Sequence, residues 1–168
     1  MATMYSADEL LAIAVQIEDN GAAFFRKAAA LRSNGEESRL LLQLANEEVQ
    51  HAQTFRQMRR ELDMGPSAQD LGKLRDLDYF YIEAIADAHG GEGSIDAVEQ
   101  LTASMSIVDI LFMAIGFEQK SILFYLGMKD AVPPHMGQSI MDTIVSVEKG
   151  HIAQLQECLG KQRVNASG

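Results

Sequence analysis

The segment NEEVQH (residues 46–51) and the segment VEKGH (residues 147–151) each contain a glutamate followed three positions later by a histidine. The two pairs stand 100 positions apart, and a further glutamate precedes each pair by 30 positions. Two lone glutamates and two Glu-x-x-His pairs are the ligand set of a two-metal carboxylate site inside a four-helix bundle. The six candidate ligands are Glu18, Glu48, His51, Glu118, Glu148 and His151.

The same offset of 100 positions relates other residues around the candidate ligands. The matching apolar or aromatic pairs are Ala14 and Ala114, Phe24 and Phe124, Phe25 and Tyr125, and Leu44 and Ile144. Similarity at a fixed offset indicates a repeated structural unit. The chain is therefore predicted to contain two helical hairpins, each of which supplies half of one site.

Apolar residues recur at spacings of three and four through four long stretches, which predicts helices with one buried face. Their expected limits are Ser6 to the Ser33-Asn34-Gly35 break, Glu36 to Gly65-Pro66, Ser94 or Leu101 to Lys129, and residues 135–160. Residues 66–104, with a short helix expected near 76–88, form the predicted long crossover between the hairpins. We expect an all-α fold in one domain over residues 1–162, followed by a disordered tail over residues 163–168.

The composition excludes several classes of function. The formal net charge is −10, and an acidic surface repels nucleic acid and anionic membranes while it attracts cations. Cys158 is the single cysteine, which excludes a disulfide scaffold, an iron–sulfur centre and a four-cysteine zinc site within one chain. The N-terminus lacks a signal-peptide pattern, and no apolar run approaches the roughly 18–20 residues of a membrane span, so a cytoplasmic location is expected.

The positions of the lone glutamates favour metal binding over solvation. Glu18 and Glu118 fall in the middle of predicted helices among apolar neighbours, where a charged carboxylate is costly unless it is paired or binds a metal. Two divalent ions would neutralise four carboxylates, and two imidazoles would complete the set. Mixed oxygen and nitrogen donors suit iron or manganese, and zinc can occupy the same ligands. The alternatives are a solvated helix face and a bundle that kept the ligand pattern but lost the metal.

Three residues near the candidate ligands are weaker candidates. Glu47 is rotated about 100° from Glu48 on a helix, which suits a solvated residue or one that contacts the ligands without binding the metal itself. Tyr125 follows Glu118 by seven positions on the same helix face, where it can donate a hydrogen bond to the site, limit radical damage or pack in the core. Glu83, in the predicted crossover, is a candidate for an additional carboxylate.

Four runs of the sequence resemble rubrerythrin-type members of the ferritin-like superfamily. These runs are AVQIEDNGAAFF (14–25), NEEVQH (46–51), GFEQKSILFY (116–125) and VEKGH (147–151). The resemblance covers about residues 8–160. It implies a ferritin-like four-helix bundle, a homodimer, and a non-haem diiron centre that reacts with hydrogen peroxide or O2. By the same resemblance, the six candidate ligands would hold two iron ions.

The chain departs from the rubrerythrin pattern in two ways. Typical rubrerythrins append a rubredoxin-like domain whose four cysteines serve electron transfer to the diiron site, and this chain has one cysteine. They also carry an extra glutamate one turn from the ligand on the third helix, where Ile115 and Ser121 stand here. Electrons would therefore come from a separate donor such as a rubredoxin, and the missing carboxylate would have to come from elsewhere, for example from Glu83.

Three functions follow as hypotheses. The leading one is a diiron oxidoreductase that reduces hydrogen peroxide or O2 with electrons from a separate protein. The second is a ferroxidase or iron-binding protein for iron handling, which the acidic charge and the missing electron-transfer domain favour. The third is a metal-free helical interaction protein. The sequence leaves open iron against manganese, the physiological substrate and electron donor, and the oligomeric state, including exchange of helices between subunits.

Overall fold

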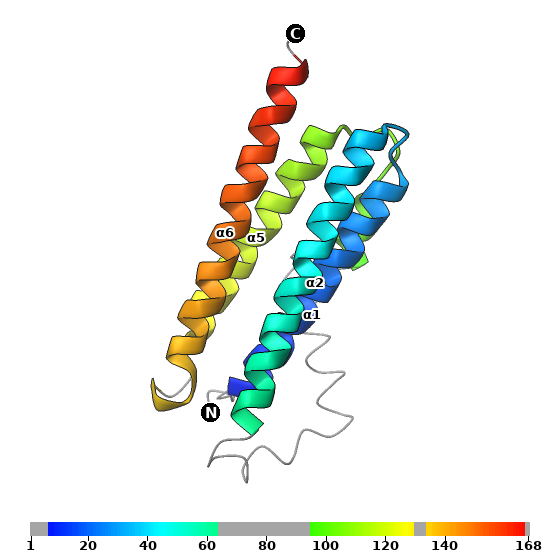
Figure 1. Cartoon of the computed structure of the whole chain (residues 1–168). Helices are drawn as coiled ribbons and strands as arrows, with labels where there is room; N and C mark the ends of the chain where they lie inside the picture. Colours follow the sequence, from blue (N-terminus) through cyan, green and yellow to red (C-terminus); the bar gives the residue numbers. More distant parts are fainter. Residues whose placement is uncertain (1–6, 64–94, 130–133, 167–168) are drawn as a thin grey trace.

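A computed structural model describes residues 7–63, 95–129 and 134–166, and these residues form five α-helices and no strand. The helices are α1 (Ala7–Ala30), α2 (Gly35–Asp63), α4 (Ile95–Gln100), α5 (Ile107–Lys129) and α6 (Pro134–Ala166). The helix α1 packs along α2, and α5 packs along α6, as two antiparallel hairpins that lie side by side (Figure 1). The predicted all-α bundle of two helical hairpins is confirmed.

The turn between α1 and α2 is built by polar side chains. The side-chain oxygen of Asn34 accepts a hydrogen bond from the Glu36 amide at 2.9 Å, which caps the first turn of α2. The Arg32 guanidinium extends from the same turn and donates to the backbone oxygens of Thr102 at 3.2 Å and Ala103 at 3.3 Å. The turn therefore closes the first hairpin and ties it to the segment that precedes the second.

The third predicted helix is interrupted, so its expected start at Ser94 or Leu101 is wrong. The short helix α4 precedes a turn, and α5 begins at Ile107. Two residues cap α5 reciprocally: Ser106 N–H donates to Asp109 Oδ2 at 3.0 Å, and Asp109 N–H donates to Ser106 Oγ at 3.1 Å. This cap fixes where α5 starts, although apolar residues continue on both sides of it.

The last helix is longer than predicted. It begins at Pro134 and continues to Ala166, so residues 163–166 of the expected tail are helical. The Arg163 guanidinium lies 4.9 Å from the centre of the Phe112 ring on α5. A cation above an aromatic face is attracted to it, so this contact holds the end of α6 against the bundle.

The helices α2 and α5 run in the same direction, and residues 64–106 connect the end of one to the start of the other (Figure 1). A long connection of this kind distinguishes a crossover bundle from a simple up-and-down bundle. The expected helix near 76–88 and the carboxylate of Glu83 fall in this connection and lie outside the described residues.

The interior contains two apolar clusters along the bundle axis. One cluster contains Phe24 on α1 and Leu111 on α5, and it also takes in residues of α2 and α6. The other contains Phe55 on α2 and Met141 on α6, together with residues of α1 and α5. Along each of the four long helices, the candidate ligands lie between members of the two clusters. The fold therefore places these polar residues in one layer between two apolar layers.

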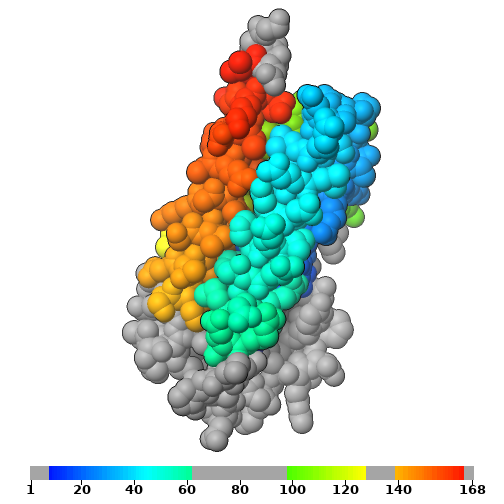
Figure 2. Space-filling view, viewed as in Figure 1, coloured from blue at the N-terminus to red at the C-terminus, as the bar shows by residue number. Residues whose placement is uncertain are grey.

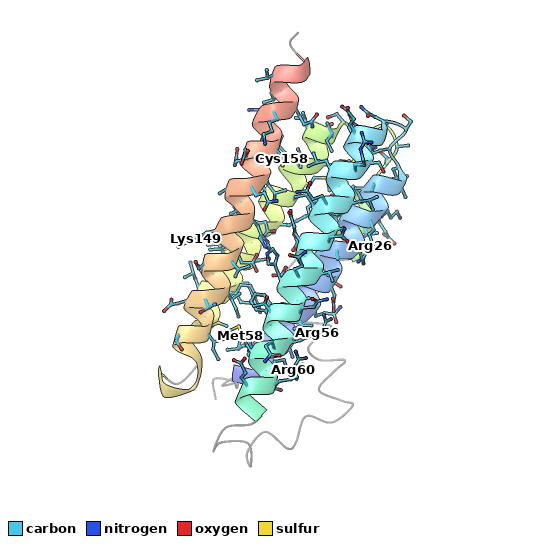
Figure 3. All side chains as sticks on the ribbon, in the orientation of Figure 1. Arg26, Arg56, Met58, Arg60, Lys149 and Cys158 are labelled. Carbon is cyan, nitrogen blue, oxygen red and sulfur yellow. The ribbon has the colours of Figure 1, made fainter. Side chains whose placement is uncertain are left out.

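Charged side chains also stand on the outer surface. Arg26, Arg60 and Lys149 are exposed (Figure 3). On the face seen in Figure 2, α2 and α6 lie side by side. Within the described ranges, no helix combines the length and the apolar character that crossing a membrane requires.

Candidate metal centre

The six candidate ligands come together at one level of the bundle. The helix α1 supplies Glu18 and α5 supplies Glu118, while α2 and α6 each supply one Glu-x-x-His pair. Residues three apart lie on one face of a helix, so each pair presents both side chains to the interior. All four carboxylates are buried, with exposed fractions between 1% and 5%. The six side chains thus form one cluster, and their role as metal ligands is a proposal taken up below.

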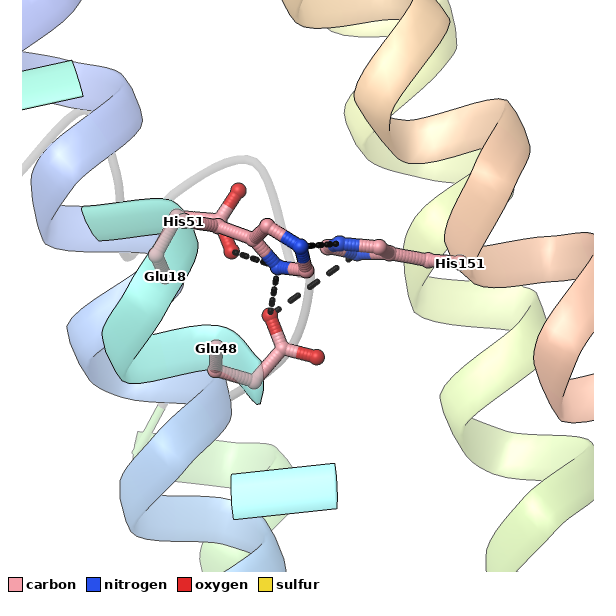
Figure 4. Close-up of side chains that lie close together, drawn as sticks. All are labelled: Glu18, Glu48, His51 and His151. Carbon is pink, nitrogen blue, oxygen red and sulfur yellow. Dashed lines mark hydrogen bonds and ion pairs between the residues drawn. The ribbon is translucent and has the colours of Figure 1, made fainter. Parts of the chain in front are cut away.

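One group of side chains centres on His51 and is shown in Figure 4. Glu18, Glu48, His51 and His151 each offer a ligand atom within 4.8 Å of the others. His51 Nδ1 lies 3.8 Å from Glu18 Oε2 and 3.9 Å from Glu48 Oε2. His151 Nδ1 lies 3.8 Å from the same oxygen of Glu48. The Glu48 carboxylate therefore faces both histidines.

A second group contains Glu118, Glu148 and His151, whose ligand atoms meet the same 4.8 Å limit. His151 Nδ1 lies 2.9 Å from Glu118 Oε1 and 3.6 Å from Glu148 Oε2. His151 belongs to both groups, and its Nε2 lies 3.2 Å from His51 Nε2. In the described part of the chain, these two groups are the sets of His, Cys, Asp and Glu side chains that could hold a metal, and they share one centre.

Glu48 and Glu148 hold equivalent places in the repeat but differ in pKa. Burial acts to raise the pKa of Glu48, but its contacts with His51 and Glu18 and the charge of His151 outweigh burial and leave the pKa below its ordinary value. Burial raises the pKa of Glu148 to about 7. The charge of Glu48 also acts to raise the pKa of Glu148, whereas Glu48 Oε2 itself has two imidazoles within 3.9 Å.

The charge of the cluster fits bound cations. Four buried carboxylates carry four negative charges when ionised, and the two imidazoles, whose Nε2 atoms are in contact, can balance at most one of them. Burial lowers the pKa of His151, which favours the neutral form that binds metals. The Oε1 atom of Glu148 is buried and has no hydrogen-bond partner among the described residues. Oxygen and imidazole donors in this number fit two divalent ions of iron or manganese.

Tyr125 lies beside the cluster and is fully buried. Burial, and then the charges of Glu148, Glu18 and Glu118, raise the pKa of Tyr125 well above its ordinary value. Its hydroxyl has no hydrogen-bond partner within the part of the chain that the structure describes. Tyr125 also packs in the second apolar cluster. The phenol therefore stays protonated and combines a packing role with a hydrogen available for donation.

The residues next to the candidate ligands include no further buried carboxylate on α5 and one hydrogen-bonded glutamate on α2. Ile115 and Ser121, which stand where rubrerythrins carry an extra glutamate, are both buried on α5. Glu47 accepts hydrogen bonds from Gln43 on α2 and from Gln154 on α6. Gln154 was not among the candidates predicted from the sequence. Its one signal in the sequence is a break of the repeat, because the matching position 54 holds a threonine.

Comparison with known proteins identifies the fold. Neither a protein-family model nor a curated protein matches the chain. Among solved structures, the chain is similar to a Thermotoga maritima protein assigned as a ferritin-like diiron-carboxylate protein. The TM-score is 0.58 at 22% sequence identity, and the match covers 96% of this chain and 99% of that one. The chain has a ferritin-like fold.

The ferritin-like fold accounts for the arrangement of the candidate ligands. In carboxylate metalloproteins of this fold, two helices each project one glutamate into the core, and two others each project a Glu-x-x-His pair. Here α1 and α5 carry the lone glutamates, and α2 and α6 carry the pairs. The predicted fold class is confirmed, and the metal and the reaction are proposed below.

Proposed function

We propose that this protein is a non-haem diiron oxidoreductase of the rubrerythrin type, which reduces hydrogen peroxide or O2 with electrons from a separate protein. The observation that carries this proposal is the convergence of six candidate ligands from four helices in one buried cluster. A metal-free bundle would bury the same four carboxylates with at most one compensating imidazolium, which is costly.

The candidate ligands hold distinct places around the centre. Glu18 Oε2 lies 3.8 Å from His51 Nδ1, and Glu118 Oε1 lies 2.9 Å from His151 Nδ1, so each lone glutamate accompanies one histidine. Glu48 faces both histidines, which suits a carboxylate shared between two metal positions.

Two ferrous ions held by these residues would supply the two electrons that convert one hydrogen peroxide molecule and two protons into two water molecules. The residues of the chain position and shield this reduction. The apolar clusters on either side of the ligand layer limit the access of water to the core. The Tyr125 hydroxyl, which has no acceptor among the described residues, would donate a hydrogen bond toward an oxygen substrate in the cluster.

Iron handling is the second candidate function. Oxidation of Fe(II) for storage or delivery uses the same ligands and requires no electron-donor protein. The net charge of −10 favours it, because an acidic surface gathers cations.

Metal analysis and rapid kinetics separate the candidate functions. Protein purified without chelators should contain about two iron ions per chain. Manganese or zinc in their place would point to another chemistry, and metal-free protein would favour an interaction protein. Oxidation of the ferrous protein that is faster with peroxide than with O2, and turnover that depends on added rubredoxin, support the oxidoreductase. Fe(II) oxidation by O2 without any effect of rubredoxin supports iron handling.

We propose that the protein carries out this reaction as a homodimer in the cytoplasm. Phe112, Leu123 and Leu126 are 46%, 69% and 47% exposed, and their spacing places them on one face of α5. Exposed apolar side chains that share one face offer a surface for association with a second copy, with the Arg163 guanidinium over the Phe112 ring. Light scattering should show a dimer that Leu123→Glu converts into a monomer. A monomeric wild-type protein would contradict the dimer.

A further inference from the structure

The repeat is broken at two polar positions next to the candidate metal centre. Glu47 precedes the ligand Glu48, whereas the matching position holds Val147, which packs against an apolar cluster. Gln154 follows the ligand His151 by one turn, whereas the matching position holds a threonine. Both polar residues lie on the side where α2 and α6 face each other, and the Gln154 amide donates to Glu47 Oε2 across that seam.

A recess reaches the centre at this seam. The space in it that a water-sized sphere can occupy is about 10 Å³, and it opens to solvent. Six residues line it, and they are Leu44, Glu47, Glu48, His151, Gln154 and Leu155. Two of the six candidate ligands are therefore in contact with a space that is open to solvent. The side chain of His51, on the same two-helix face, is 27% exposed, compared with 7% for that of His151.

The Glu47 carboxylate is fixed at the mouth of this recess by two neutral amides. Gln43 Nε2 donates to Glu47 Oε1 at 3.0 Å, and Gln154 donates to Glu47 Oε2. An amide orients a carboxylate without cancelling its charge, whereas a lysine or an arginine would neutralise it. The carboxylate also borders the centre, since Glu47 lines the recess together with Glu48 and His151.

We propose that divalent cations reach the metal centre through this recess, and that Glu47 is the carboxylate that first attracts them and passes them to Glu48 and His151. The inference rests on the metal site proposed above, and it adds the route of access and the residues that control it. A fixed negative charge at the mouth of a recess raises the local concentration of cations and their rate of association. Gln154 holds the carboxylate in place and partly closes the mouth.

Rapid mixing of metal-free protein with Co(II), followed by the visible absorbance of the bound ion, measures loading without any turnover. Glu47→Gln should slow loading by about tenfold at low salt, and the deficit should shrink as salt is added. The number of Co(II) ions bound at saturation should remain that of the wild-type protein. Glu61→Gln is the matched control, because Glu61 also lies on α2 and accepts a hydrogen bond from the glutamine four positions earlier, at 2.9 Å. It makes the same change of charge away from the recess and should load at the wild-type rate.

A second variant tests the closing role of Gln154. Gln154→Ala removes the amide that spans the seam, so both Co(II) loading and its removal by excess chelator should become several-fold faster, with the stoichiometry unchanged. Wild-type rates in both Glu47→Gln and Gln154→Ala would overturn the proposed route. Loss of a bound ion in Glu47→Gln at saturation would also overturn it, because Glu47 would then be a ligand of the centre. A wild-type protein that binds no Co(II), Fe(II) or Mn(II) would instead overturn the proposed function, and the route with it.

Discussion

The Nε2 atoms of His51 and His151 lie 3.2 Å apart, although the two residues are 100 positions apart in the sequence. In such a contact one nitrogen carries the hydrogen and the other accepts it, so the two imidazoles cannot both be protonated. The Nδ1 atoms are directed at carboxylates, that of His51 at Glu18 and that of His151 at Glu118. The ring whose Nε2 carries the hydrogen has, when neutral, an unprotonated Nδ1 that is placed to bind a metal, whereas the ring whose Nε2 accepts carries its hydrogen on Nδ1.

Replacing a shared ligand should remove metal and activity together. His151 belongs to both groups of donors, and Glu48 faces both histidines, so Glu48→Ala and His151→Ala each affect both metal positions. The metal content should fall from about two ions per chain to less than one, as measured by elemental analysis after desalting. Glu61→Ala, at an exposed position of α2, is the control and should keep its metal. Undiminished metal in both ligand variants would show that the ligand assignment is wrong.

Removal of the metal should lower the melting temperature. Without cations, four carboxylates face one another in a buried layer, and their repulsion destabilises the fold. A ligand present at 100 times its Kd contributes about 2.7 kcal/mol. At roughly 2–4 °C per kcal/mol for a chain of this size, the melting temperature should fall by about 5–10 °C. Calorimetry before and after dialysis against a chelator measures the change, and reloading should reverse it. Equal melting temperatures would count against a buried shared site.

The spacing of the sequence was enough to locate the candidate ligands and the helices that carry them. A Glu-x-x-His pair falls on one face of a helix whatever the helix packs against, so that relationship is local. Glu18 and Glu118 stand in otherwise apolar stretches, and a buried carboxylate needs partners, so their convergence also followed from the sequence.

The spacing of residues could not show how one helix is rotated against another, where a helix starts, or how charges from different helices affect each other. The hydrogen bond from Gln154 to Glu47 depends on how α6 is turned against α2, and no periodicity records that rotation. The start of α5 depends on the reciprocal cap of Ser106 and Asp109, while the apolar pattern runs through it. The pKa of Glu148 depends on its burial and on the nearby charge of Glu48, although its sequence motif equals that of Glu48.

Metal binding should release about one proton per chain at pH 6 and almost none at pH 8. Burial raises the pKa of Glu148 in the metal-free protein to about 7, so at pH 6 an incoming cation has to displace its proton. The pKa values of Glu48 and His151 are lowered, so these two residues contribute less. The apparent affinity should therefore fall by ~tenfold per pH unit below pH 7 and level off above it.

Calorimetric titration with Mn(II) in two buffers of different ionisation enthalpy counts the protons released. Equal proton release at pH 6 and pH 8 would contradict the assignment of this titration to Glu148. A proton release that increases with pH would be the reverse of the expected trend. It would indicate that the proton comes from a group that ionises at higher pH, such as Tyr125, whose pKa is raised by burial and by the neighbouring carboxylates.

Tyr125→Phe should keep the metal and stabilise the metal-free protein. The hydroxyl is buried without a partner among the described residues, and removing such a group while its ring is retained gains about 1–2 kcal/mol. Phe25, at the matching position of the repeat, is also fully buried, so a phenylalanine ring fits this layer of the bundle. The midpoint of urea denaturation of the metal-free protein should rise, with the metal content unchanged. A lower midpoint would mean that the hydroxyl has a stabilising partner in the folded protein.

The same variant separates the two roles of Tyr125 in the proposed reaction. If the hydroxyl donates a hydrogen bond to the oxygen substrate, peroxide turnover should fall by about 100-fold or more while the metal content stays constant. Packing alone predicts unchanged turnover, because the ring and its contacts in the apolar cluster remain. Measuring turnover and metal content on the same preparation is decisive, since a loss of activity with full metal can come only from the missing hydroxyl and not from a damaged ligand set.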